Sequence, residues 1–389
     1  MDRRRLLIVV IVVTVLLLFL ALAKTAGIKP AVKNEESLSN IKLPEGFKIS
    51  LFATGLGGSS ISRPGTNPGP RMMLLNGDTL FVTLPAQGKV IALKDDNGDW
   101  RADEAFTFIE GLAKPHGIDF YNGWFYIAGE STVIRVRDED GNLAADKDST
   151  EVLIGDLPTG GHSTRTVKVH NGSMYVSIGS SCNVCNEEDE RRAAIIRCSL
   201  TGKNCTVFAE GMRNAVGFIF SGDAIYATEN GRDLLGDDAP PDEINMVEES
   251  GNYGWPTCYG KNIHDTDFDK NTYIRNPCME PFEAESLVDL QAHSAPLGLA
   301  RYESSTFPEP YRGDIFVAFH GSWNRAQPTG YKIVNVDIAT GKVSDFATGW
   351  LQQSGNVLGR PVDIIVAADG SLLVSDDNAG SIYRISYSS

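Results

Sequence analysis

The stretch MMLLNGDTLFVT, at residues 72–83, sets the pattern for most of this chain: an apolar run, a tight turn containing glycine, and a second β-rich run. The same phrase returns five more times, at residues 118–128, 167–177, 218–228, 311–319 and 364–375. Successive turn glycines lie 46, 49, 50, 91 and 57 residues apart. A period of about 50 residues built from hairpins is typical of a β-propeller with one small sheet per repeat. We therefore predict an all-β, six-bladed β-propeller over residues 43–389.

One repeat is longer than the others, and the chain before the first repeat carries an extra strand. The 91-residue gap leads to an insertion at residues 232–295, which is rich in Asp, Asn, Pro and Tyr and is predicted to be irregular loop with short elements. Before the first repeat, Phe47, Ile49 and Leu51 alternate with polar residues, as in a half-buried strand. We expect this strand to pair with residues 382–386, because closing the ring removes a free sheet edge.

The N-terminus has the features of a targeting segment. Arginines at residues 3–5 precede an uncharged apolar run at residues 6–23. This run is long for a signal peptide and just long enough to span a bilayer, so residues 1–23 are either a cleaved signal or a membrane anchor. Residues 24–42 form a polar linker. In both cases the arginines stay inside and the body of the protein is exported, either anchored facing outward or secreted.

The charge of the chain limits its partners. With 50 acidic and 35 basic residues, the formal net charge is −15. This argues against a nucleic-acid ligand, because proteins that bind nucleic acid present a basic face. The excess of carboxylates is compatible with cation sites.

The chain has six cysteines, and an even number outside the cytosol indicates disulfides. Six cysteines allow 15 pairings. Closeness in sequence favours three local pairs, Cys182–Cys185, Cys198–Cys205 and Cys258–Cys278. The alternative is a zinc site made by the first four cysteines, although the second pair has the wrong spacing for one.

Residues that stand just before the first strand of each repeat are expected to meet near the axis at one end of a propeller. These positions carry histidine, arginine and asparagine: His116, His162, Arg213, Asn214, His293 and Arg360. Arginine and asparagine around a channel suit an anionic ligand with several carboxylates. A neighbouring histidine suits proton abstraction near neutral pH. We therefore predict a functional site at this end of the axis.

An acidic segment follows the first arginine of this set. It extends from Glu229 to Glu243 and combines carboxylates with glycine and proline. Hard oxygen donors on a constrained loop favour Ca²⁺, but the spacing is not that of an EF-hand. A solvated acidic loop is the alternative.

Several phrases resemble a known family. The segments GGHSTRT at 160–166, GMRNAVGF at 211–218, DEINMVEESGNYGWP at 242–256 and HGSWNRAQPTGYK at 320–332 closely resemble the L-sorbosone dehydrogenase branch of the PQQ-dependent sugar dehydrogenases. This group includes soluble glucose dehydrogenase and the aldose sugar dehydrogenases. The resemblance begins near residue 43 and continues to the C-terminus. It implies a six-bladed propeller that holds pyrroloquinoline quinone (PQQ) over Ca²⁺ near the axis.

The resemblance also implies an activity. It predicts oxidation of an aldose or sugar aldehyde by hydride transfer to PQQ, followed by electron transfer to a quinone or a cytochrome. His162 matches the general base that takes the proton of the sugar hydroxyl. Arg213, Asn214 and Arg360 match cofactor contacts, and Arg325 is a loose counterpart of a family lysine.

The same comparison implies two Ca²⁺ sites. Gly231 and Arg232 match positions whose backbone carbonyls bind the catalytic Ca²⁺. Glu243 and Tyr253 match a second, structural Ca²⁺ site.

Besides Arg325, the chain departs from the family pattern at two further places. Val362 stands where the family has a second arginine that binds the cofactor. The family glutamine that binds substrate has no clear match, since Leu112 or His116 lies there. Two other functions therefore stay open: a Ca²⁺-dependent lactonase-type hydrolase, and a ligand-binding propeller without catalysis.

Overall fold

The six predicted blades are present, and each is a four-stranded antiparallel sheet. The computed structural model describes residues 35–57, 69–279 and 283–388. The expected signal or anchor at residues 1–23 lies outside the described residues. In the part that is described, no helix is long and apolar enough to cross a membrane.

Blades 1 to 3 follow one another along the chain without interruption. Blade 1 consists of β2 (Met73–Asn76), β3 (Thr79–Leu84), β4 (Lys89–Lys94) and β5 (Glu104–Glu110). Blade 2 consists of β6 (Gly117–Tyr121), β7 (Trp124–Ala128), β8 (Val133–Val136) and β9 (Glu151–Ile154). Blade 3 consists of β10 (Arg165–His170), β11 (Ser173–Ile178), β12 (Ala194–Ser199) and β13 (Thr206–Glu210).

Blades 4 to 6 contain the insertion and the ring closure. Blade 4 consists of β14 (Phe218–Ser221), β15 (Ala224–Glu229), β16 (Asp242–Val247) and β19 (Val288–Leu290). Blade 5 consists of β20 (Pro296–Arg301), β21 (Ile315–Phe319), β22 (Lys332–Asp337) and β23 (Lys342–Ala347). Blade 6 consists of β24 (Pro361–Val366), β25 (Leu372–Asp376), β26 (Ser381–Tyr387) and β1 (Phe47–Thr54).

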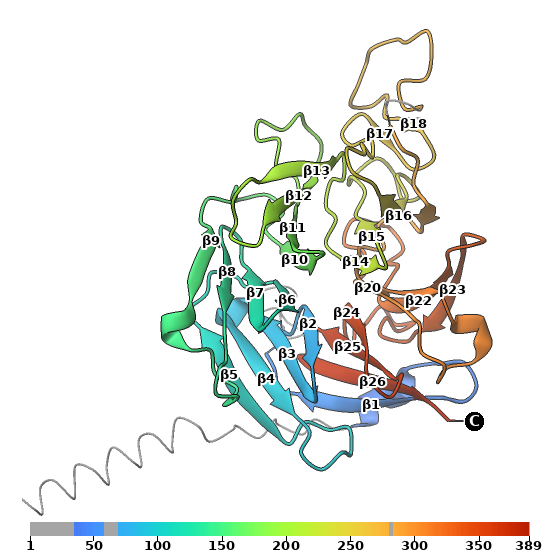
Figure 1. Ribbon diagram of the computed structural model, residues 1–389. Helices are drawn as coiled ribbons and strands as arrows, with labels where there is room; N and C mark the ends of the chain where they lie inside the picture. Colours follow the sequence, from blue (N-terminus) through green and yellow to red (C-terminus); the bar gives the residue numbers. More distant parts are fainter. Residues whose placement is uncertain (1–34, 58–68, 280–282, 389) are drawn as a thin grey trace, which may run out of the picture.

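Short 3₁₀ turns complete the regular structure of the described chain. They are η1 (Glu35–Asn40), η2 (Pro85–Gln87), η3 (Lys147–Ser149) and η4 (Glu309–Tyr311). Figure 1 shows the sheets arranged in a ring, with β2, β6, β10, β14, β20 and β24 nearest its centre.

The Asn-Gly turns explain why the repeats form hairpins. Asn122 and Gly123 both have positive φ, at 49° and 80°, and so do Asn171 and Gly172, at 46° and 74°. Two successive positive φ angles match the twist of the flanking strands, and asparagine followed by glycine adopts them at little cost.

Ring closure occurs as the sequence predicted. β1 pairs antiparallel with β26, from Phe47 opposite Tyr387 to Thr54 opposite Ser381. The Phe47 ring packs edge-on against Phe307 and Phe346 of blade 5, with centroid distances of 4.7 and 5.0 Å. Burial of this aromatic cluster anchors the leading strand to blade 5.

The region predicted as an insertion is partly blade. β16 and β19 lie within residues 232–295 and form the two outer strands of blade 4. The prediction missed β16 because Asp242 and Glu243, which begin it, are buried charged residues that do not resemble a strand. The excursion that remains between β16 and β19 carries a two-stranded sheet, β17 (Cys258–Tyr259) and β18 (Ile263–His264), and projects from the ring in Figure 1.

The predicted disulfides are confirmed. The pairs are Cys182–Cys185, Cys198–Cys205 and Cys258–Cys278. Because all these sulfurs are bonded to one another, no thiolate is left in the described chain for the zinc site considered as the alternative.

Candidate active site on the propeller axis

A polar cavity of about 380 Å³ lies on the axis at the end where the inner strands begin. Five of the six residues predicted to meet there line the cavity, and so does Gly231: His162, Arg213, Asn214, His293 and Arg360 are the five. They come from loops of blades 3 to 6, because inner strands of neighbouring blades start side by side. The cavity therefore combines cationic, imidazole and amide groups from distant parts of the sequence.

Three residues predicted for the ligand site do not line this cavity: His116, Arg325 and Arg232, the last of which lines the smaller cavity described below. His116 is buried, and its Nε2 lies 3.3 Å from Nη2 of Arg71, which does line the cavity. Arg325 turns toward the acidic loop, where it forms an ion pair with Asp238 at 2.7 Å and donates to the Asp237 carbonyl. The negative charge of that loop accounts for the direction of Arg325.

The structure adds three residues that sequence reasoning missed. Arg71 and His320 line the cavity, and Asp377 holds both of them. Arg71 Nη1 donates to Asp377 Oδ2 at 2.6 Å, and His320 Nε2 lies 2.9 Å from Asp377 Oδ1. Arg71 stands just before β2, as Arg360 stands just before β24. The positional rule that residues just before the first strand of each repeat meet near the axis could therefore have identified Arg71.

Arg213 is fully occupied by the protein itself. Its Nε and Nη2 donate to the carbonyl and Oδ1 of Asn183 at 2.8 and 3.0 Å, and Nη2 also donates to Asp233 at 2.9 Å. Its Nη1 donates to the carbonyls of Asn230 and Gly231 at 3.1 and 2.9 Å. These contacts engage all five N–H donors of the guanidinium. Arg213 can offer a ligand its charge, but not a further hydrogen bond.

Arg71 and Arg360 keep donors for a ligand. Arg360 Nε and Nη2 donate to the carbonyls of His320 and Gly321 at 3.0 and 2.7 Å. Within the described residues, Nη1 of Arg360 and Nε of Arg71 have no acceptor. Two partly free guanidinium groups at one cavity can bind carboxylates.

His162 is held as a neutral base. Its Nδ1 lies 3.0 Å from the carbonyl oxygen of Ser180, which can only accept a hydrogen bond, so Nδ1 carries the proton. Nε2 therefore keeps its lone pair. Burial, followed by the positive charge of Arg213, lowers the pKa of His162 to about 4. The imidazole is neutral at pH 7 and can accept a proton.

This protonation state is open to direct measurement. In the protein without added ligands, we expect the His162 ring to stay neutral from pH 8 down to about 5 and to protonate near pH 4. The midpoint lies below the ordinary histidine value because the cationic form is the one that burial and Arg213 disfavour. Histidine-labelled NMR titration, with His162→Gln to assign the resonance, measures it. A midpoint near 6.5 would contradict the burial and charge described here.

Hard oxygen donors surround Gly231 at the same cavity. The backbone N of Gly231 donates to Asp242 Oδ1 at 3.0 Å, and that of Ala295 donates to Oδ2 at 2.9 Å. Burial raises the pKa of Asp242 to about 7. Asp233 and Asn230 also line the cavity. A buried carboxylate beside carbonyl and amide oxygens suits a divalent cation of the Ca²⁺ type.

A second, much smaller cavity shares Gly231 with the first. It has a volume of about 10 Å³, enough for one small ion or water, and is lined by Glu229, Arg232, Glu243 and Tyr253. Oε2 of Glu229 is buried and has no partner among the described residues. Burial, reinforced by the charge of Glu243, raises the pKa of Glu229 well above its ordinary value.

The other predicted metal residues near this small cavity differ in what they offer. Burial raises the pKa of Glu243 to about 7, so a cation would favour its ionised form. The Arg232 guanidinium is already bound to Asp265 at 2.6 Å. The Tyr253 hydroxyl donates to the Met246 carbonyl at 2.6 Å. Glu229 and Glu243 are therefore the better cation ligands here.

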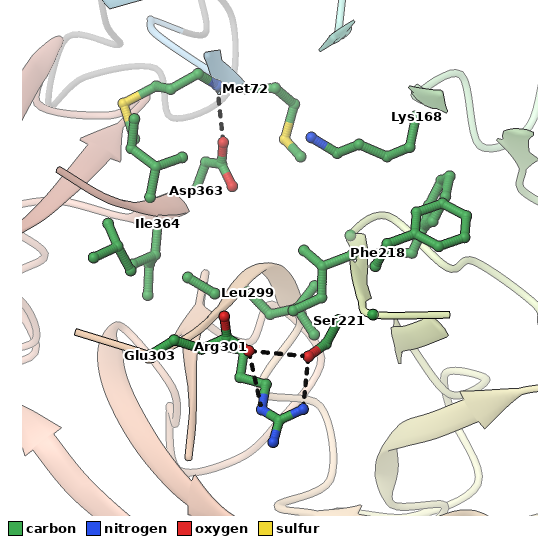
Figure 2. A pocket seen from close by; sticks show the side chains of 17 residues that line it. Met72, Lys168, Phe218, Ser221, Leu299, Arg301, Glu303, Asp363 and Ile364 are labelled. Atoms are coloured by element: carbon green, nitrogen blue, oxygen red, sulfur yellow. Dashed lines mark hydrogen bonds and ion pairs between the residues drawn. The ribbon is translucent and has the colours of Figure 1, made fainter. Parts of the chain in front are cut away.

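Three apolar side chains close the axis below the site. Val216, Leu297 and Val362 form a small buried cluster, and Val216 and Leu297 also line the polar cavity. Farther along the inner strands lies another cavity of about 310 Å³, where Figure 2 shows Lys168, Asp363 and Leu299 around a common space. Val362, which stands where the family has a second arginine, thus belongs to a plug between two cavities.

Fold and site together define a six-bladed propeller with an axial ligand cavity lined by arginine, histidine and carboxylate groups. Residues 67–388 match the TrAA12-like family. The chain belongs to this family. Its narrower placement in the sorbosone dehydrogenase branch stays a prediction.

Two relatives are similar to this chain in sequence. An uncharacterized protein of Borreliella burgdorferi is 34% identical over 374 residues, which cover 91% of this chain and 92% of that protein. A pyrroloquinoline quinone-dependent pyranose dehydrogenase of Coprinopsis cinerea is 35% identical over 119 residues, but these cover only 25% of this chain and 15% of the relative.

Solved structures share the fold. A calcium structure of a Trichoderma reesei enzyme of carbohydrate-active enzyme family AA12 aligns with a TM-score of 0.74 at 21% identity, covering 90% of this chain and 97% of that one. The holo form of the PQQ domain of pyranose dehydrogenase from Coprinopsis cinerea aligns with a TM-score of 0.71 at 21% identity, covering 89% and 97%.

Proposed function

We propose that this protein is a PQQ-dependent oxidoreductase that oxidises an aldose or sugar aldehyde, with PQQ and Ca²⁺ in the axial cavity. The observation that carries the proposal is the meeting of a neutral His162 with the free donors of Arg71 and Arg360 in one cavity. The relative from Coprinopsis cinerea, a PQQ-dependent pyranose dehydrogenase, and the calcium structure of the AA12 enzyme support the same assignment.

The residues around the cavity fit such a cofactor. PQQ supplies a two-electron acceptor for the hydride of the substrate. Arg71 and Arg360 would bind its carboxylates, and Asn214 would contribute an amide. The Gly231 carbonyl, with the carbonyl of Arg232 and the carboxylate of Asp242, would hold Ca²⁺ beside it. Arg213 would add positive charge.

His162 would act on the substrate. Its unprotonated Nε2 would take the proton of the sugar hydroxyl as hydride leaves the carbon that bears it. Trp323 lies at the rim of the cavity with 73% of its surface exposed, and its flat apolar face would pack against a sugar ring. A second cation held by Glu229 and Glu243, with Tyr253 at the same small cavity, would stabilise the region behind Gly231.

The partners outside the cavity follow from the same proposal. Reduced cofactor requires an acceptor, which we propose to be a quinone or a cytochrome. Three disulfides are typical of proteins that fold in an oxidising compartment, which supports export. Anchoring of the N-terminal segment in a membrane stays a prediction.

Reconstitution tests the proposed function. Protein incubated with PQQ and Ca²⁺ should reduce an artificial electron-accepting dye with at least one sugar of an aldose panel. Backbone carbonyls bind Ca²⁺ poorly unless the cofactor adds ligands, so PQQ and Ca²⁺ should bind cooperatively. Removal of Ca²⁺ by a chelator should therefore weaken PQQ binding. Lactone hydrolysis without PQQ would favour the hydrolase instead. PQQ binding without turnover of any sugar would favour a ligand-binding propeller.

A further inference from the structure

We propose that the loop closed by the Cys182–Cys185 disulfide positions the wall of the axial cavity, and that Asn183 is the positioning residue within it. The cofactor consequences of this proposal rest on the function proposed above. Its structural basis does not, because it concerns contacts between residues of the protein.

Asn183 uses its side-chain oxygen and nitrogen and its backbone carbonyl to hold the cavity wall. Its Oδ1 accepts hydrogen bonds from the backbone N of Asp233 at 2.7 Å and from Arg213 Nη2 at 3.0 Å. Its Nδ2 donates to the Asp233 carbonyl at 2.9 Å. Its carbonyl accepts from Arg213 Nε at 2.8 Å and from Trp255 Nε1 at 3.3 Å.

The residues that Asn183 holds are cavity residues. Arg213 in turn donates a hydrogen bond to the Gly231 carbonyl at 2.9 Å. Asp233 in turn accepts a hydrogen bond on Oδ1 from Asn324 Nδ2 at 3.0 Å. Arg213, Gly231, Asp233 and Asn324 all line the cavity. One asparagine in blade 3 therefore fixes groups from blades 4 and 5.

The same loop also reaches the histidine. The Cys182 carbonyl accepts a hydrogen bond from Ser180 Oγ at 2.6 Å, and that hydroxyl lies 3.0 Å from His162 Nδ1. The two residues at the start of the loop, Cys182 and Asn183, thus face different parts of the site. A shift of this loop would move both the proposed base and the proposed cation wall.

The Cys182–Cys185 disulfide adds a covalent constraint to these hydrogen bonds. Cys182 and Cys185 are only partly buried, and the segment between β11 and β12 in which they lie forms no strand. Such a segment has little packing to hold it and depends on its cross-link and hydrogen bonds for order. Opening the disulfide should release Asn183 while leaving the blade core intact.

Two matched pairs of variants test the proposal. Cys182→Ser/Cys185→Ser is compared with Cys198→Ser/Cys205→Ser, which opens a disulfide joining β12 to the turn before β13 of the same blade. Asn183→Ala is compared with Asn186→Ala, which removes an exposed asparagine three residues on. Asn183→Asp keeps the Oδ1 acceptor and serves as the conservative variant.

The first readout needs no cofactor. Hydrogen–deuterium exchange of residues 229–233 should become faster in Cys182→Ser/Cys185→Ser and in Asn183→Ala, and unchanged in both controls. Equal exchange in the test and control pairs overturns the positioning role, whether or not the protein binds PQQ.

The second readout is PQQ affinity with saturating Ca²⁺, measured by spectroscopic titration. Both test variants should bind PQQ roughly 10–100-fold more weakly, as is common when a supporting residue is removed. Asn183→Asp should recover part of this loss, which a general loss of folding would not allow. Unchanged affinity in both test variants overturns the cofactor consequence. Absence of PQQ binding by the parent protein instead refutes the proposed function, and the exchange experiment still decides the role of the loop.

Discussion

Replacement of His162 by alanine should lower turnover of an active sugar roughly 10²–10⁴-fold, the usual cost of removing a positioned general base. Nδ1 of His162 carries the proton that is donated to the Ser180 carbonyl, so Nε2 keeps a lone pair that can accept the substrate proton. PQQ and Ca²⁺ should stay bound, because His162 acts on substrate. The measurement is steady-state turnover of protein reconstituted with PQQ and Ca²⁺, with bound PQQ quantified separately.

Other histidines provide the controls for this result. His116→Ala and His293→Ala should lose far less turnover, since His116 is buried beside Arg71 and His293 Nε2 is bound to the Gly236 carbonyl at 2.6 Å. If His162→Ala turns over within about threefold of the parent, the assignment of the base is wrong. His320, the cavity histidine that is bonded to Asp377, is then the next candidate.

Asp377→Ala should produce the largest loss of stability among the cavity variants, roughly 3–5 kcal/mol, because it removes a buried carboxylate and leaves two largely buried partners without their counterpart. Asp377 bonds Arg71 and His320 at 2.6 and 2.9 Å. Burial alone would raise its pKa, but the interactions with His320 and Arg71 outweigh burial and hold the pKa of Asp377 below its ordinary value.

The lowered pKa of Asp377 determines how the stability difference between parent and variant depends on pH. A carboxyl whose pKa is lower in the folded protein contributes stability above its unfolded pKa of about 4, and this contribution is lost as pH falls toward the folded value. The difference between parent and Asp377→Ala should therefore be full at pH 7 and shrink in acid. Urea unfolding at several pH values measures it. Glu151→Gln, which removes an exposed partner of Arg135, is the control, and an equal effect of both changes would contradict the prediction.

The sequence was sufficient to predict the six-bladed ring but only part of the candidate active site. Blade number, closure by β1 and the three disulfides follow from local patterns: hairpin turns, alternating residues and neighbouring cysteines. The positional rule for the axis considered only residues before each first strand. His320 and Asp377 follow the second strands, β21 and β25, which return to the same end of the propeller, so the rule did not include them.

Other features of the site depend on contacts that a sequence does not contain. Arg213 and Arg360 occupy equivalent positions, yet one has every donor engaged and the other does not. Arg325 was expected near the cofactor, but the acidic loop holds it outside the cavity lining. Side-chain direction of this kind is decided by the charges and carbonyls that surround each arginine after folding.

The pairing of β1 with β26 also has a consequence for biosynthesis. β1 precedes and β26 follows every other strand of the propeller in the chain, so β1 has no partner until nearly the whole domain has been made. Until then both β1 and the outer edge of β25 have unsatisfied backbone groups. Chains that end early cannot complete blade 6 and keep exposed edges that proteases and chaperones recognise. The pairing of the first and last strands thus acts as a check on the completeness of the propeller.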